Sequence, residues 1–134
     1  MRREEGFVSV ELVLGLGLLV LPVALLVLML PIWISRQNLA RLAAQQGARV
    51  AVVSESQEQG AAAARASVAG AGLDPGKDLT LNFEPASSFA PGGLVIVDVT
   101  IDAPVLAIPF LGTAGSFRVE ARFSERVDPY RSGR

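Results

Sequence analysis

The side chains of this 134-residue chain offer few routes to chemistry, because it contains no His and no Cys. Thiol nucleophiles, imidazole bases, disulfides and zinc or haem sites built on these residues are therefore excluded. Acid–base chemistry would have to come from Asp, Glu, Tyr130 or the single lysine, Lys77. These residues form no catalytic constellation in the sequence, so we expect a protein that is not an enzyme.

The aspartates are also poorly spaced to bind a cation. Asp98 and Asp102 would share one face of a strand but stand about 13 Å apart at ~3.3 Å per residue. One calcium ion needs its ligands at about 2.4 Å. The segment 74–78 lacks the spacing and the closing Glu of an EF-hand loop. We therefore expect neither a metal site nor a cofactor.

Glu11 needs a physical reason, because it directly precedes a long apolar segment. The 23 residues from Leu12 to Ile34 carry no charge, and all but four of them are hydrophobic. As a helix they would rise about 35 Å at ~1.5 Å per residue, enough to cross a hydrocarbon core of about 30 Å. A carboxylate at that depth is costly. The simplest reading places Glu11 in the headgroup zone, together with Glu4 and Glu5.

Two other readings of the apolar segment fit less well than a single membrane span. About 100 remaining residues could hardly enclose a helix that is apolar on all sides. A cleaved secretory signal has an apolar core of about 7–15 residues and a small-residue cleavage site, which Trp33 to Arg36 does not supply. Trp33 would suit the membrane interface. Arginines flank the span evenly, so the positive-inside rule does not decide its orientation.

The stretch from Arg2 to Leu12 resembles the type IV prepilin signature. In that family a short charged leader ends in Gly, a prepilin peptidase cuts after it, and Glu is the fifth residue of the mature chain. The resemblance implies cleavage between Gly6 and Phe7, which makes Glu11 the fifth mature residue. Glu11 would then lie one helical turn from the new ammonium group, on the same face. By resemblance, Glu11 would neutralise the N-terminal ammonium of a neighbouring subunit in a staggered array of parallel helices.

Pro22 and Pro31 would weaken or bend the apolar helix locally. Pilin helices often carry a similar proline where the helix partly melts in the filament. Membrane helices also tolerate proline without such a role. The sequence leaves these two readings open.

The region after the span is balanced in charge, with ten basic and ten acidic residues from residue 35 to the C terminus. It therefore offers no polybasic surface for lipid or nucleic acid. The segment 36–53 reads as a continued helix, with Arg41, Gln45 and Arg49 on a solvated face. The expected apolar stripe consists of Leu39, Leu42, Ala43, Gln46, Val50 and Val53.

A polar break over 54–60 and a second, Ala-rich helix over 61–70 are expected next, and this helix should pack closely on its neighbour. Turn residues over 72–76 end it. Strict alternation of apolar and polar residues then predicts three strands with one apolar face each, over 79–83, 95–102 and 117–123. The loops between them are expected over 90–93 and 103–116. Phe110 and Leu111, in the second loop, would form either an exposed contact or a plug of the core, and we favour the core.

The predicted fold class is therefore α+β. A long N-terminal membrane-spanning helix continues into a small domain, in which one or two helices pack on a three-stranded antiparallel sheet. We expect a leader over 1–6, a membrane and assembly helix over 7–34, and an extracytoplasmic domain over 35–134 whose tail, 127–134, is flexible.

The predicted helix segment from Ala43 to Val50, with the sequence AAQQGARV, resembles that of TadE/TadG-like proteins. These are minor pilins or pseudopilins of the tight-adherence (Tad) pilus. The Ala-rich helix and the β-rich end are similar too, and the tail from Val127 to Arg131 resembles actinobacterial members. Leu12 departs from the family, because many Tad pilins have an aromatic residue after the Glu. That departure and the chain length argue against the short major pilin.

The resemblance implies a membrane protein with its N terminus in the cytoplasm, which enters or primes a surface pilus. Its partners would be a prepilin peptidase, other pilins and the pilus assembly platform, with no nucleic acid directly implied. The pilus would serve adherence, surface attachment or DNA uptake. The alternative is a permanently anchored single-span protein whose outer domain binds a partner.

Overall fold

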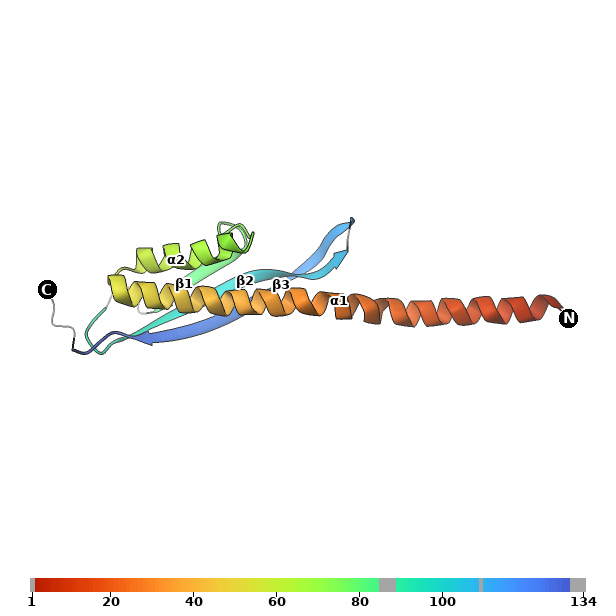
Figure 1. Cartoon of the computed structure of the whole chain (residues 1–134), viewed down its shortest axis with the longest axis horizontal. Coiled ribbons are helices and arrows are strands. Elements are labelled where there is room, and N and C mark those ends of the chain that lie inside the picture. The colour runs from red at the N-terminus through yellow and green to blue at the C-terminus, as the bar shows by residue number, and fades with distance from the viewer. Residues whose placement is uncertain (1, 85–88, 109, 131–134) are drawn as a thin grey trace.

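The chain forms two helices followed by three strands, as a computed structural model shows (Figure 1). The structure describes residues 2–84, 89–108 and 110–130, with residues 2–5 described by their backbone alone. The predicted α+β class is confirmed. The elements are α1 (Arg2–Ser54), α2 (Gln57–Gly70), β1 (Leu79–Glu84), β2 (Leu94–Ile108) and β3 (Gly112–Arg126).

Helix α1 is a rod of 53 residues, and neither Pro22 nor Pro31 interrupts it. Its C-terminal half carries the rest of the domain, while its N-terminal half projects alone (Figure 1). The helix ends at Ser54, and Glu55 adopts a φ of 51°. Ser56 then caps α2, because its side chain accepts a hydrogen bond from the backbone of Gln59. The predicted break over 54–60 is therefore too long, since helix resumes as soon as this cap is formed.

Glycine and alanine bring α1 and α2 into close contact. A Cβ atom built on Gly60 would lie 2.6 Å from Ala51 Cβ and 2.6 Å from the carbonyl oxygen of Gly47. A Cβ atom on Gly47 would lie 3.3 Å from Ala64 Cβ. The close packing predicted for the Ala-rich helix is confirmed, and the phrase AAQQGARV supplies the α1 side of this contact.

The buried face of α1 differs from the predicted stripe. Leu42 and Val53, predicted to be buried, are exposed. Arg41, Gln45 and Arg49 are exposed, as predicted. Both the sheet and α2 pack against this half of α1, so small residues, rather than the larger ones, occupy the contact. The fully buried residues of this face are Ala40, Ala43, Ala44, Ala48 and Ala51.

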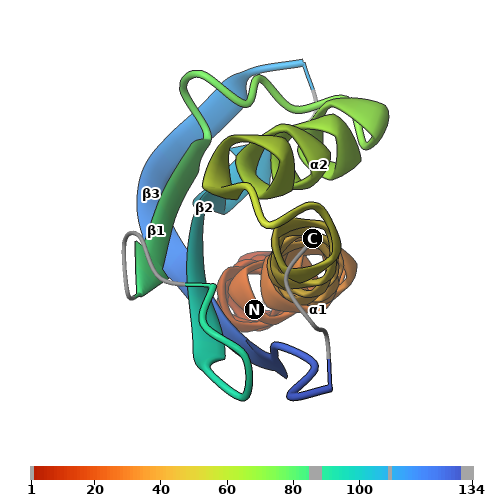
Figure 2. The same ribbon diagram turned by 90° about the vertical axis from the view of Figure 1, so that its left-hand side faces the viewer.

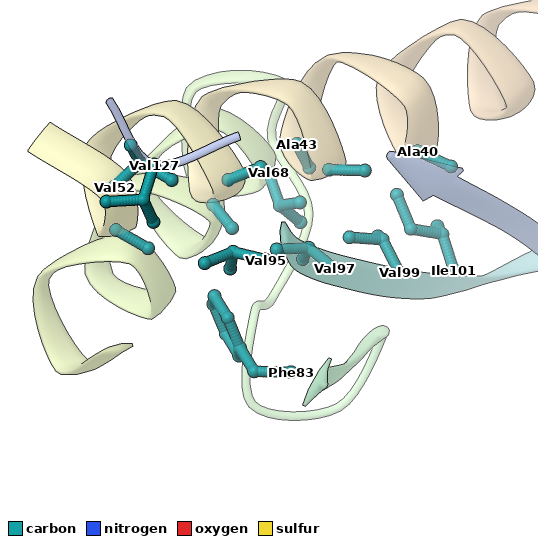
Figure 3. Close-up of a cluster of buried hydrophobic side chains, with 14 residues drawn as sticks. Ala40, Ala43, Val52, Val68, Phe83, Val95, Val97, Val99, Ile101 and Val127 are labelled. Atoms are coloured by element: carbon teal, nitrogen blue, oxygen red, sulfur yellow. The ribbon is translucent and has the colours of Figure 1, made fainter. Parts of the chain in front are cut away.

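The three strands form one antiparallel sheet in the order β1-β2-β3, and both helices lie on the same side of it (Figure 2). Alternate residues of β2 point toward the helices and are buried. They meet Phe83 from β1, Val68 from α2 and Val127, which follows β3 (Figure 3). The inward row of β2 consists of Val95, Val97, Val99, Ile101 and Ala103.

The outer face of the sheet is polar. Asp98 on β2 accepts two hydrogen bonds from Arg122 on β3, from Nε at 2.6 Å and from Nη2 at 2.9 Å. The hydrogen bond from Arg122 holds the pKa of Asp98 below its ordinary value of 3.8. Because the Arg122 side chain is largely exposed, solvent screens the pair and it contributes little to stability.

The hairpin of β2 and β3 is longer than predicted. The segment 103–116, expected to be a loop, continues the ladder from Pro104 opposite Ser116 to Ile108 opposite Gly112. Apolar residues occupy both faces here, so no alternation marks the segment as a strand. Positive φ values at Gly112 and Gly115 let β3 follow a path that other residues rarely adopt.

We predict that Gly60→Ala destabilises the domain by about 1–3 kcal/mol, because the added methyl group overlaps Ala51 and the Gly47 carbonyl. Urea unfolding in mild detergent, followed by the fluorescence of Trp33, measures the change. Gly70→Ala is the matched control, since no atom lies within 4 Å of the added Cβ. Equal stability of the two variants would contradict the close contact of the helices.

Candidate functional site

The N-terminal half of α1 is an apolar surface that the other described residues leave uncovered. From Phe7 to Leu28, each residue except Leu25 is exposed. An 18-residue window of this helix has a mean hydropathy of 2.9, and only 6% of the window is buried. The helix is thus long and apolar enough to cross a membrane. A core helix of a water-soluble domain would instead be covered by its own chain.

The predicted processing site lies at the start of this surface. Gly6 and Phe7 are exposed in the first turns of α1, and nothing lies within 4 Å of a Cβ built on Gly6. Met1, the first residue of the predicted leader, lies outside the described residues. The new N terminus that cleavage after Gly6 would create is therefore accessible.

Glu11 lies one helical turn beyond Phe7 and is also exposed. It borders an open groove along the helix with Val8, Leu12, Gly15 and Leu19. No hydrogen bond or ion pair joins Glu11 to another side chain in the part of the chain that the structure describes. The structure thus brings Phe7 and Glu11 onto one exposed helix face.

The predicted helix-kink residues lie in different surroundings. Pro22 borders a second open groove, lined by apolar residues such as Leu18 and Leu21. Pro31 is exposed about two turns further on, between Met29 and Trp33. Membrane helices tolerate such prolines, because neighbouring helices and local adjustments satisfy the backbone groups that proline frees.

The β2–β3 hairpin covers the last turns of the apolar segment, which sequence reasoning did not predict. The indole Nε1 of Trp33 donates a hydrogen bond to the carbonyl oxygen of Pro104, at 3.0 Å. The ring of Trp33 meets that of Phe117 edge to face, with centroids 5.9 Å apart. One turn earlier, the backbone N–H of Ala107 donates to Met29 Sδ at 3.2 Å. Trp33 therefore satisfies its polar atom within the protein.

Phe110 and Leu111 lie at the tip of this hairpin, and their predicted place in the core is wrong. Their relative exposures are 107% and 82%. Residues 95–103 of β2 already fill the space between the sheet and the helices, so the hairpin tip extends beyond the core. The signal that could have indicated this is the absence of charge between Asp102 and Arg118.

The remaining predicted features concern metals and the C-terminal tail. Among the described residues, no group of three or more acidic side chains could hold a metal ion. The absence of a cofactor stays a prediction. Val127, the first residue of the predicted flexible tail, is buried and paired with Gly92 and Gly93 through backbone hydrogen bonds. The tail therefore begins after Val127, and residues 131–134 lie outside the described residues.

No family model matches the chain, and no curated protein or solved structure is significantly similar to it.

We predict that Trp33→Phe loosens the hairpin from α1, because it removes the hydrogen bond to Pro104 while keeping an aromatic ring. The lost bond costs about 0.5–1.5 kcal/mol. Faster amide hydrogen exchange over 105–107 and 113–117 measures the loosening. Tyr130→Phe is the control, since it also removes one polar atom but from an exposed ring beyond the C-terminal end of β3. Unchanged exchange in Trp33→Phe would show that this contact does not hold the hairpin.

Proposed function

We propose that the protein is a TadE-like minor pilin or pseudopilin of a Tad-type pilus, made as a membrane-inserted precursor and assembled through α1. The observation that carries the proposal is the division of α1 into a half built into a folded domain and an exposed apolar half of about 22 residues, Phe7–Leu28. Such a half-helix needs a bilayer before assembly and other apolar helices after it. The sequence resemblance around Gly6 and Glu11 supports this class of protein.

The proposal implies a topology and a set of partners. The N terminus faces the cytoplasm until a prepilin peptidase cuts after Gly6, and the domain that follows Ser35 lies on the outer side of the membrane. The other partners are further pilins and the pilus assembly platform. The protein is then the substrate of another enzyme and not an enzyme itself.

Glu11 has a specific electrostatic role in this scheme. Cleavage leaves an ammonium group on Phe7, four residues before Glu11, and both positions are exposed on α1. Inside a bundle of apolar helices an unpaired charge is expensive, so each carboxylate and each ammonium group needs a partner. Pairing Glu11 with the ammonium group of a neighbouring subunit satisfies both charges and sets the stagger between subunits.

A permanently anchored single-span protein is the second candidate, because the same exposed half of α1 is long enough to cross a bilayer once. Its outer domain would bind a partner. Such a protein keeps Met1 and does not depend on Glu11, so the two experiments below separate the candidates.

We predict that the mature chain begins at Phe7 in cells that contain a prepilin peptidase. Mass spectrometry of the purified N terminus reads this directly. Gly6→Leu should stay uncleaved, because the peptidase site is lost, while nothing lies within 4 Å of a Cβ added there. Gly15→Leu, at an equally open position, should be cleaved normally. Pili that form while the chain retains Met1 would remove processing from the mechanism.

We predict that Glu11→Gln leaves cleavage intact but abolishes assembly. An uncompensated ammonium group costs about 3–5 kcal/mol at each subunit contact, which is enough to suppress filament formation. Electron microscopy of piliation and N-terminal mass spectrometry measure the two effects separately. Glu58→Gln makes the same change on the exposed first turn of α2 and should leave both unchanged. Normal piliation in Glu11→Gln would exclude Glu11 from assembly.

A further inference from the structure

The tip of the β2–β3 hairpin is an apolar surface separate from that of α1. Phe110 and Leu111 are almost fully exposed there, and Val105 on the adjoining strand is exposed as well. The fifteen residues from Ala103 to Phe117 contain no charged side chain, although Asp102 and Arg118 flank them directly. The distal part of the hairpin thus has the composition of a buried segment but lies at the surface.

The contacts of the hairpin place its tip beside the apolar segment of α1. Pro104 contacts Trp33, and Ala107 contacts Met29, so β2 advances toward the N terminus of the helix as it leaves the core. The turn that follows Ala107 continues in that direction. Figure 1 shows the tip reaching back along α1 and bending away from it. The helix therefore leaves the tip uncovered, although the tip lies beside the apolar segment of α1.

The backbone of the tip is suited to an apolar environment. The N–H of Leu111 donates to the carbonyl oxygen of Ile108 at 3.1 Å, and Ile108 pairs with Gly112 across the hairpin. These bonds satisfy backbone groups that lipid could not. Phe110 has a φ of 70°, a conformation that a bulky residue rarely adopts. The turn accepts this strain, and its aromatic side chain stays exposed.

We propose that Phe110 and Leu111 insert into the interface of the outer leaflet, as a second lipid contact next to the membrane span. This inference rests on the proposed membrane insertion of α1. A phospholipid bilayer is the partner that fits this surface. The tip is uncharged and lies next to the apolar segment of α1. It bends away from the helix near Met29, where the hairpin begins to cover that segment. Aromatic and aliphatic side chains of peripheral segments enter this boundary by about 5–10 Å.

The second contact has a consequence for the span. A single helix can slide and rotate in a bilayer, and its depth follows only from its flanks. A hairpin fixed to Met29 and Trp33 adds a contact on one side of the helix, so it sets both the depth and the rotation of α1. The lipid-facing segment is then Phe7–Leu28, about 33 Å long at ~1.5 Å per residue. It ends where the hairpin begins to cover the helix.

Site-directed spin labelling tests the proposal, because the chain has no native cysteine. We would label Leu111→Cys in the full-length chain, reconstituted in phosphatidylethanolamine and phosphatidylglycerol vesicles. Collision rates with oxygen and with a water-soluble nickel complex separate lipid from water. Leu18→Cys, in the exposed half of α1, is the membrane reference, and Leu94→Cys, a half-exposed leucine at the other end of β2, is the water reference.

We expect the label at 111 to favour oxygen, as the label at 18 does, but at a shallower depth, while the label at 94 favours nickel. If the label at 18 is in lipid and the label at 111 is in water, the hairpin proposal is overturned and the membrane span stands. If the label at 18 is in water, the membrane span itself fails. A label at 111 that is shielded from both reagents and broadened by neighbouring labels would show that a second copy of the chain covers the tip, which also overturns the proposal.

Discussion

The uncovered apolar surface of α1 is the constraint on which the rest of the structure depends. A helix satisfies its own backbone hydrogen bonds, so it can pass from lipid into a folded domain without interruption. The exposed part of α1 gives way to the part covered by the domain at Met29 and Trp33, whose side chains contact the β2–β3 hairpin. Before that point, the described part of the chain leaves the apolar helix uncovered.

Small side chains let the second half of α1 support the whole domain. Gly47 and Ala51 admit α2 at close range, and other alanines of the helix meet the inward valines of β2. Because these residues leave little space between the elements, the sheet and α2 both pack directly on one helix. The direction of the domain relative to the rod is thus fixed by three contacts, with α2, with the sheet and with the hairpin. Subunits that associate through the rod would present the domain in a constant orientation.

The sequence predicted elements whose periodicity follows from one buried face. The strands around Val97, Leu81 and Val119 alternate strictly, and structure and prediction agree there.

Prediction failed for elements that do not have one buried and one exposed face. The segment 103–116 is apolar on both faces, so its strands carry no alternation, and the predicted place of Phe110 in the core is wrong. The stripe containing Leu42 failed because α1 is covered on two sides and the contact selects small residues over large ones. Gly6, Phe7 and Glu11 come from a motif alone, because no periodicity marks them, and the fold adds their exposure on one helix.

Flotation of the full-length chain in a density gradient, after membranes are washed with alkaline carbonate, tests whether lipid covers the exposed half of α1. This wash releases peripheral proteins and leaves membrane-spanning ones in place. We predict that the chain rises with the lipid. Recovery of the folded chain in the soluble fraction at the bottom of the gradient would contradict a membrane role for the segment Phe7–Leu28.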